Sequence, residues 1–430
     1  MKLLTKLRDE KDGYPIDDEW KYVDSWYRVN DQDRYNSITS GLDYKNTIES
    51  QDKSVSRLLY GKNMNTSVSR LENYELCPFS FYLRYGLKLR EREVYKLETP
   101  DIGSFLHEII EKFSKKVLEE DIDLRSITRE QSDEIVSNIS DEVLINFRHN
   151  LFSSTGKLRN LSVKLKEQVK KTIWLIIIHI KSGEFNLMGS EVEFGKGKEY
   201  PEIIIELSED NKLILSGKVD RVDVADLGDE KYIRIIDYKS SNKSIKLSNV
   251  YYGVQLQLLA YSDAISTDAF KPGGVFYLKL DDPIARVDKK ISKEEIEDSI
   301  IKTLRMNGLI ISNVKLIEAM DSEFNESKDG VSYESEILNL KKSKEGKFSK
   351  MPIVSEKDFE KLRIHMRKTL KDIGDEIMSG NVKNEPLERK GVISPCDYCS
   401  FKKACMFDRS LGNRVRRLNE LKDEEVLEKL

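Results

Sequence analysis

Four cysteines restrict how this chain can fold more than any other feature of its sequence. Cys77 stands alone, and 318 residues further on Cys396, Cys399 and Cys405 follow one another in a C-x2-C-x5-C pattern. Four thiolates are a ligand set for a zinc ion or an iron-sulfur cluster. If one metal centre binds all four sulfurs, the chain must bring two segments from opposite ends of a domain together.

Disulfides and unrelated buried thiols are the alternatives to a shared metal site. Disulfides form in oxidising compartments, but the N-terminal sequence MKLLTKLRDEKDG has no apolar stretch typical of a secretory signal. Burial without a metal suits Cys77, whereas the stretch SPCDYCSFKKAC around the other three cysteines is too polar for a core. We therefore favour metal binding and expect a cytoplasmic bacterial protein; the spacing leaves zinc and iron-sulfur both open.

Charge and hydropathy exclude two classes of protein. With 72 Lys and Arg against 76 Asp and Glu, the net charge is −4, so any contact with DNA must come from local patches. The longest apolar run, near residues 173–180, is interrupted by His179 and flanked by Lys171 and Lys181. It is far too short to span a membrane, so we expect a buried helix and no membrane partner.

Apolar periodicity predicts an α/β chain of roughly two to three domain-sized units. Helical spacing runs from Gly103 to about Gly183, and alternation follows in four stretches, which are residues 191–194, 203–207, 213–224 and 232–238. These stretches predict a small, largely antiparallel sheet, followed by a helix over 255–265 and a strand over 275–280. A charged helix near 293–306, a polar mobile loop over 321–350 and a helix over 356–378 complete the prediction.

A helix start is also expected just before Cys77. Ser69 and Glu72 have the S-x-x-E spacing of a capping box. Cys77 would then lie about two turns into a short helix, or just past its end at Pro78.

Charged residues that suit metal chemistry lie in the predicted sheet. In GKVDRVD, Asp220 and Asp223 fall on opposite faces, whereas Asp237 and Lys239 of IIDYKS share one face. A charged pair on an apolar strand is costly unless it is used. Mg²⁺ binds few carboxylates and also phosphate oxygens, and a nearby ammonium stabilises an attacking hydroxide. The alternative is that Asp237 merely ends a strand and Lys239 is a solvated lysine.

Two predicted helices add polar groups to this set. In GSFLHE, helical spacing puts Gly103 and His107 on one face, although a single histidine is more often packed or solvated than a ligand. Gln257 and Tyr261 are four residues apart and share a face, with Gln255 close by. Such a pair can hold a phosphate or orient a lysine.

In this order, the motifs GSFLH, GKVD, IIDYKS and QLQLLAY resemble the RecB-type branch of the PD-(D/E)xK nuclease superfamily. The outer segments SVSRLENYELCPF, FYLRYGLKL and CDYCSFKKACMFD narrow the resemblance to the C-terminal nuclease domain of the AddB family. The resemblance covers about residues 59–408. It implies a restriction-endonuclease-like core, a small mixed sheet flanked by helices, with a helical insertion and an iron-sulfur-stapled region near both termini.

The resemblance also implies a role for each motif residue. His107, Asp220 and Asp237 would bind Mg²⁺ with the Tyr238 carbonyl, Lys239 would stabilise the attack, and Gln257 and Tyr261 would complete the catalytic set. Cys77, Cys396, Cys399 and Cys405 would carry a 4Fe-4S cluster that holds the domain ends together and supports binding at a DNA end. The implied reaction is hydrolysis of phosphodiester bonds in single-stranded DNA, on the 5′-ended strand, in a heterodimer with an AddA-type helicase-nuclease subunit that serves double-strand break repair by homologous recombination.

One departure from the family concerns the motor. Members of the family have a helicase-like N-terminal half with a phosphate-binding loop, and this sequence has no G-x-x-x-x-G-K-[ST] motif. We therefore expect a fragment or shortened form. Its expected divisions are 1–58 as the end of a helicase-like region, 59–102 as an arm with the first cysteine, 103–190 as a helical block, 191–285 as the nuclease core, 286–390 as accessory helices and the loop, and 391–430 as the cysteine cluster and basic tail.

Basic residues flank both cysteine segments and suit a local DNA path. They are Arg84, Lys88, Arg90, Arg92, Lys402, Lys403, Arg409, Arg414, Arg416 and Arg417. Tyr82, Tyr85 and Phe401 are candidates for base stacking, although a solvated face with core aromatics explains them equally well. The alternative to a nuclease is a non-catalytic DNA-binding scaffold with zinc at the cysteines.

Overall fold

A six-stranded mixed sheet lies at the centre of the computed structural model, which describes residues 2–11, 13–42, 44–91, 99–147, 152, 154–280, 302–326 and 331–430. The strand order is β12-β8-β7-β6-β5-β2. The strands are β2 (Asn186–Phe194), β5 (Gly217–Asp226), β6 (Lys231–Lys239), β7 (Lys271–Lys279), β8 (Asn307–Ile311) and β12 (Ile353–Val354). The β6–β7 and β8–β12 pairs are parallel and the others antiparallel, which confirms the expected small mixed sheet of an α/β protein.

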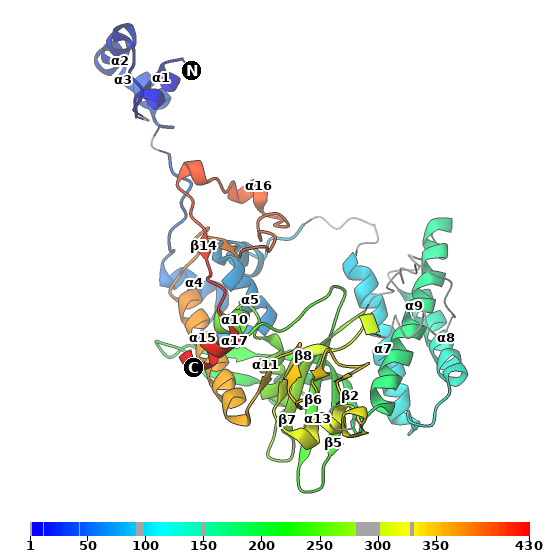
Figure 1. The fold of residues 1–430 in the computed structure, drawn as a ribbon. Helices are drawn as coiled ribbons and strands as arrows, with labels where there is room; N and C mark the ends of the chain where they lie inside the picture. Colours follow the sequence, from blue (N-terminus) through cyan, green and yellow to red (C-terminus); the bar gives the residue numbers. More distant parts are fainter. Residues whose placement is uncertain are drawn as a thin grey trace.

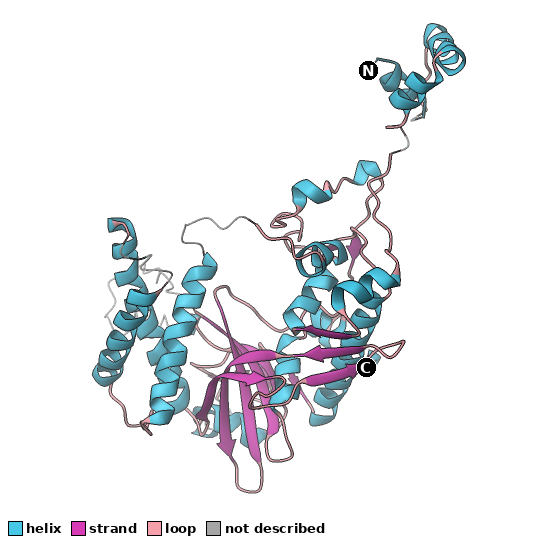
Figure 2. Cartoon of the chain, turned by 180° about the vertical axis from the view of Figure 1, so that it is seen from behind, coloured by secondary structure: helices cyan, strands magenta, loops and turns pink. Residues whose placement is uncertain are grey.

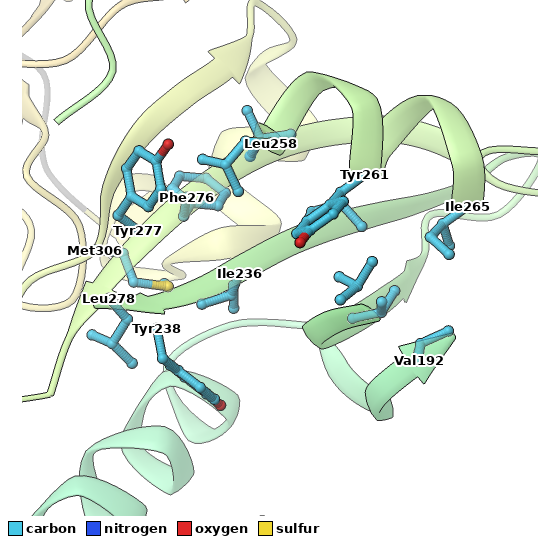
Figure 3. Close-up of a cluster of buried hydrophobic side chains, with 14 of the residues drawn as sticks. Val192, Ile236, Tyr238, Leu258, Tyr261, Ile265, Phe276, Tyr277, Leu278 and Met306 are labelled. Atoms are coloured by element: carbon cyan, nitrogen blue, oxygen red, sulfur yellow. The ribbon is translucent and has the colours of Figure 1, made fainter. Parts of the chain in front are cut away.

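Helices cover this sheet and bury its central strand (Figure 2). Helix α11 (Gln257–Ile265) contacts β6 and β7, and the core between them includes Ile236, Tyr261 and Phe276 (Figure 3). From Tyr232 to Tyr238, every residue of β6 is buried, as expected for a strand covered on both faces. Asp237 therefore reaches the sheet end from a strand that packing fixes on both sides.

Three long helices stand beside the β2 edge of the sheet, where the sequence predicts a helical block (Figure 1). They are α7 (Thr99–Glu119), α8 (Arg129–Asn146) and α9 (Gly156–Lys181), and α7 contacts β2. Ile173, Ile177 and Ile180 of the apolar run are buried, so the expectation of a buried helix there is confirmed. Within the described residues, no helix is long and apolar enough to cross a membrane.

The predicted strand over 213–224 is in fact two strands in two sheets. Strand β4 (Lys212–Leu215) belongs to a second sheet of order β1-β4-β3, together with β1 (Asn63–Thr66) and β3 (Ile203–Glu206). The chain changes sheet at Ser216, whose N–H donates to the Thr66 carbonyl. A Cβ at Gly217 would lie 2.7 Å from the Phe194 ring, so this residue has to be small. Alternation alone did not reveal the break.

The N-terminal part is helical and includes the helix before Cys77. Its helices are α1 (Lys2–Lys11), α2 (Asp18–Asn30), α3 (Gln32–Thr39), α4 (Lys53–Tyr60), α5 (Val68–Leu76), α6 (Pro78–Phe81) and the π-helical turn η1 (Tyr82–Gly86). Helices α1–α3 lie apart from the sheet (Figure 1). The capping-box prediction is wrong: α5 begins after Ser67, and the Glu72 carboxylate binds elsewhere. Cys77 lies just past the end of α5, as one of the two expected placements has it.

Short elements and one long helix form the C-terminal part. They are α10 (Leu247–Tyr251), α13 (Val314–Met320), α14 (Glu323–Glu326), β9 (Tyr333–Glu334), β10 (Lys341–Lys342), β11 (Phe348–Ser349), α15 (Glu356–Met378), β13 (Leu387–Glu388), α16 (Lys402–Cys405), the 3-10 turn η3 (Arg409–Leu411), β14 (Arg416–Arg417) and α17 (Asp423–Lys429). Helix α15 matches its prediction. Of the helix expected near 293–306, residues 293–301 lie outside the described part.

The polar stretch over 321–350 is not the loop without regular structure that its composition predicts. Strands β9, β10 and β11 pair as a small antiparallel sheet. Ile337, Leu338 and Leu340 are buried, and Asp321 accepts hydrogen bonds from the Ser335 and Tyr333 hydroxyls. A few apolar residues among many charges are sufficient to fold this segment onto the core.

Candidate active site

His107, Glu191 and Asp220 form a group of ligand-type side chains at one end of the central sheet. Their ligand atoms all lie within 4.8 Å of one another, and within the described residues no other set of three His, Cys, Asp or Glu does so. His107 Nδ1 is 3.6 Å from Glu191 Oε1 and 3.9 Å from Asp220 Oδ1. An imidazole and two carboxylates at this spacing are a suitable donor set for a divalent cation.

Each member of the group is placed by a regular element. His107 lies on α7, Glu191 on β2 and Asp220 on β5. Ser190 pairs with Arg221 and Val192 with Val219, so the antiparallel register places Glu191 opposite Asp220. Sheet pairing, and not a flexible loop, therefore brings the two carboxylates together.

Glu191 is a site residue that the sequence reasoning missed. Its φ of 56° lies in the left-handed region, which is uncommon for a residue with a side chain. Lys218 Nζ lies 2.7 Å from Glu191 Oε2 and 3.6 Å from Glu111 Oε2. Nothing in the strand pattern SEVEF distinguishes Glu191 from Glu193; only the cross-strand register shows which of them faces Asp220.

Asp237 and Lys239 share a face, as the alternation predicts. Lys239 Nζ lies 2.5 Å from Asp237 Oδ2, and the Asp237 side chain is only 2% exposed. The Tyr238 N–H donates to Asp220 Oδ2 over 2.7 Å, which joins the ends of β5 and β6. Asp237 is not in the group of three, but its charge acts on both His107 and Asp220.

A chain of polar contacts continues from Lys239 to helix α11. Lys239 Nζ donates to Gln257 Oε1 over 3.4 Å, and Gln257 Nε2 donates to the Tyr261 hydroxyl over 2.8 Å. The expected shared face of Gln257 and Tyr261 is therefore present and points at the lysine. Gln255 instead binds the loop before α10, where its amide donates to the Ser244 carbonyl.

The site opens into a pocket of about 830 Å³ beside α7. Its lining includes Gly103, His107, Glu111, Lys112, Lys115, Glu191, Lys218, Asp220, Tyr238 and Lys239. Gly103 and His107 share this wall, as helical spacing predicts. Four lysines around a carboxylate centre suit a phosphodiester chain, since phosphates can lie on the lysines while the carboxylates hold a cation.

The titration behaviour of the group shows an excess of negative charge. Burial, with the charge of Asp237, raises the pKa of Asp220 to about 7. Burial lowers the pKa of His107, but the hydrogen bond to Glu191 and the charge of Asp220 raise it further, so the net shift is upward. A bound cation would relieve the repulsion between these carboxylates.

Asp223 lies away from the site, as predicted from its place on the opposite face. Its carboxylate is fully buried and accepts hydrogen bonds from Arg221 and Arg234, which are also fully buried. This ion-paired group fastens β5 to β6 directly behind Asp220 and Asp237.

The four cysteines approach one another at a second place, far from the sheet. Cys77, Cys396 and Cys399 line one pocket of about 280 Å³. Burial raises the pKa of the Cys77 thiol to about 12, and the charges of Cys405 and Cys396 contribute to the rise. The two cysteine segments are thus side by side, as the spacing predicts, although no three of the four sulfurs, all of which the structure describes, lie within 4.8 Å of one another.

The basic residues near the cysteines are divided between structural and open positions. Arg416 binds Glu75, and Arg409 and Arg417 contact Glu388. The Arg84 guanidinium lies 5.7 Å from the centre of the Phe401 ring. Lys402 and Lys403 are exposed, and Arg92 lies outside the described residues.

Comparison with known proteins agrees with this geometry. Residues 65–406 match the PD-(D/E)XK nuclease superfamily, and residues 1–41 match the fifth domain of the ATP-dependent helicase/deoxyribonuclease AddB. The chain therefore belongs to the PD-(D/E)XK nuclease superfamily.

Similar proteins are named as one of the subunits of an ATP-dependent helicase/deoxyribonuclease. The protein of Alkaliphilus oremlandii is 40% identical over 100% of this chain and 38% of its own length. That of Acetivibrio thermocellus is 39% identical over 99% of this chain and 37% of its own length. The chain thus spans well under half the length of these relatives.

Proposed function

We propose that the chain is the nuclease part of an AddAB-type helicase-nuclease and hydrolyses single-stranded DNA, from the 5′-ended strand of an unwound duplex end, with Mg²⁺. The observation that carries this proposal is the joint position of His107, Glu191 and Asp220 beside Asp237 and Lys239. The relatives are named for an ATP-dependent helicase/deoxyribonuclease, which supports DNA as the substrate and an AddA-type subunit as the partner in recombinational repair.

The donor set fits a magnesium ion. Carboxylate oxygens of Asp220, Asp237 and Glu191 with His107, and the Tyr238 carbonyl, are the proposed ligands. When bound, the cation polarises the phosphodiester and lowers the pKa of a bound water.

The protein's own groups bind, orient and neutralise. The Lys239 ammonium, held between Asp237 and Gln257, is placed to stabilise the attacking hydroxide and the charge that grows on the phosphate. Gln257 and Tyr261 orient this ammonium through their own hydrogen bond. Lys112, Lys115 and Lys218 line the pocket where neighbouring phosphates would lie.

For the cysteines we propose a 4Fe-4S cluster that joins the Cys77 segment to the C-terminal segment. Support comes from three thiols on one pocket and from the charge interactions among Cys77, Cys396 and Cys405. Protein purified without air should be brown with broad visible absorption. A colourless protein with stoichiometric zinc would contradict the iron assignment.

The test of the proposed reaction compares wild type with Asp237→Ala on linear single-stranded DNA with Mg²⁺. Asp226→Ala is a matched control, since Asp226 is an exposed carboxylate at the far end of β5. Wild type and Asp226→Ala should cut, and Asp237→Ala should not. Equal cutting by all three would exclude this site, and DNA binding without cutting by wild type would favour a non-catalytic scaffold.

A further inference from the structure

Helix α11 begins without a cap of its own, although it carries Gln257 and Tyr261. Its N-cap residue is Leu256, whose side chain makes no capping hydrogen bond. The first N–H groups of a helix have no partner within the helix, so they need an acceptor from elsewhere. The first turn of α11 therefore depends on another element for its position.

Glu72 of helix α5 supplies that acceptor. Its Oε1 atom accepts hydrogen bonds from the N–H of Leu256 over 2.6 Å and from the N–H of Gln257 over 2.8 Å. The residues are 184 and 185 positions apart in the sequence, and α5 contacts α11. A carboxylate at this place also interacts favourably with the helix dipole.

The same carboxylate faces two lysines of the site. The charges of Lys243 and Lys239 act on Glu72 and oppose the effect of burial, which raises its pKa. The Nζ atoms of Lys243 and Lys239 lie 4.6 Å and 5.8 Å from the centre of the Tyr277 ring. Two ammonium groups near one ring repel each other, and Glu72 is a carboxylate that offsets this repulsion from the α5 side.

Helix α5 also reaches the cysteine region. Cys77 follows its last residue, and Glu75 binds Arg416 of β14 with 3.1 Å between Glu75 Oε2 and Arg416 Nη1. One helix thus holds the first turn of α11 with Glu72 and the C-terminal segment with Glu75.

We infer that Glu72 is a positioning residue: it fixes the first turn of α11, and so holds Gln257 against Lys239, from the helix that leads into Cys77. Its consequence for catalysis rests on the proposed nuclease function. The hydrogen-bonding part is independent of it, because amide exchange at Leu256 and Gln257 reports the contact without any reaction.

Two substitutions of Glu72 separate its hydrogen bonds from its charge. Glu72→Ala removes both, whereas Glu72→Gln keeps a side-chain oxygen that can accept the two N–H groups. Glu75→Ala is the matched control, since it removes a half-buried glutamate of the same helix that faces Arg416 instead of α11. Metal content at the cysteines is measured in every variant to detect a general disturbance of α5.

The expected result is a specific loss in Glu72→Ala. Amide protection of Leu256 and Gln257 should fall, and kcat on linear single-stranded DNA should fall about 10- to 100-fold with KM within about twofold of wild type. Glu72→Gln should keep the protection and have an intermediate kcat, and Glu75→Ala should keep both protection and kcat. Metal content should stay at the wild-type level in Glu72→Ala and Glu72→Gln.

Three results would overturn the inference. They are unchanged protection in Glu72→Ala, a wild-type kcat in Glu72→Ala, and a loss of kcat that merely follows a loss of cysteine-bound metal or is equalled by Glu75→Ala. If wild type itself does not cut DNA, the proposed function fails separately. Protection at Leu256 and Gln257 then decides the inference alone, in the same directions.

Discussion

The candidate active site and the cysteine region both gather ligand-type side chains, but the chain holds them in different ways. His107, Glu191 and Asp220 stand on a helix and two paired strands over a buried core. The three C-terminal cysteines lie in the segment 391–412, in which no residue is buried. Packing fixes the first set before any ligand binds, whereas the second set depends on a few polar contacts and on the metal itself.

The contacts that attach the cysteine segment come largely from one asparagine. Asn46 Nδ2 donates to the Cys405 carbonyl over 2.9 Å and to the Met406 carbonyl over 2.7 Å, and the Asn46 N–H donates to the Leu411 carbonyl. Asn413 Nδ2 donates in turn to the Asn46 carbonyl over 2.5 Å. The comparison predicts that substitutions in the active site change chemistry without unfolding, and that substitutions at the cysteines loosen a local segment.

The largest effect is expected for Asp220→Ala. The substitution removes a carboxylate of the proposed metal site, so the cleavage rate of single-stranded DNA should fall about 1,000-fold. The melting temperature should not fall, because a buried carboxylate whose pKa is raised to about 7 costs stability at neutral pH. A variant that unfolds would remove the distinction between the two regions.

Next in size is the effect of Cys396→Ser on the cysteine segment. Loss of one thiolate should raise amide exchange in residues 391–412 about 100-fold, while exchange in β6 stays at the wild-type value. Ser400→Ala, in the same segment without a ligand atom, is the control. Equal exchange in wild type and Cys396→Ser would show that no metal holds this segment.

Glu191→Gln tests whether the residue that the sequence reasoning missed belongs to the site. The amide keeps the size of the side chain but loses its charge, so we expect cleavage about tenfold slower and a higher Mg²⁺ concentration for half-maximal rate. Glu193→Gln, two residues further along the same strand, pairs only with surface Lys198 and should behave as wild type. Identical Mg²⁺ dependence in the two variants would remove Glu191 from the site.

The smallest effect is expected for Asn46→Ala. Two side-chain hydrogen bonds to the cysteine segment are lost, which should favour local opening by about 1 kcal/mol, or about fivefold in exchange rate at residues 403–413. Cleavage by the nuclease site should be unchanged. A large loss of cleavage would mean that the two regions are coupled more tightly than their contacts indicate.

Local sequence patterns were sufficient wherever one element determines the geometry. The period of two placed Asp237 and Lys239 on one face, and the period of 3.6 did the same for Gln257 with Tyr261 and for Gly103 with His107. The cysteine spacing also predicted correctly that two distant segments meet.

Features that depend on pairing between distant elements could not be read in this way. Glu191 enters the site through the register of β2 with β5, and a positive φ at that residue has no sequence signal in a glutamate. Glu72 satisfied a local capping pattern, but its carboxylate binds α11, 184 residues away. In both cases a long-range contact prevailed over a local rule.

The most direct test of the account is to locate the cation. Crystals of the chain soaked in Mn²⁺ and measured at an anomalous wavelength should show one strong peak at the proposed nuclease site, within ligand distance of His107, Glu191 and Asp220, and none in crystals of Asp220→Ala. A peak elsewhere, or none in wild type at concentrations that support cleavage, would contradict the assignment of this group as the metal site.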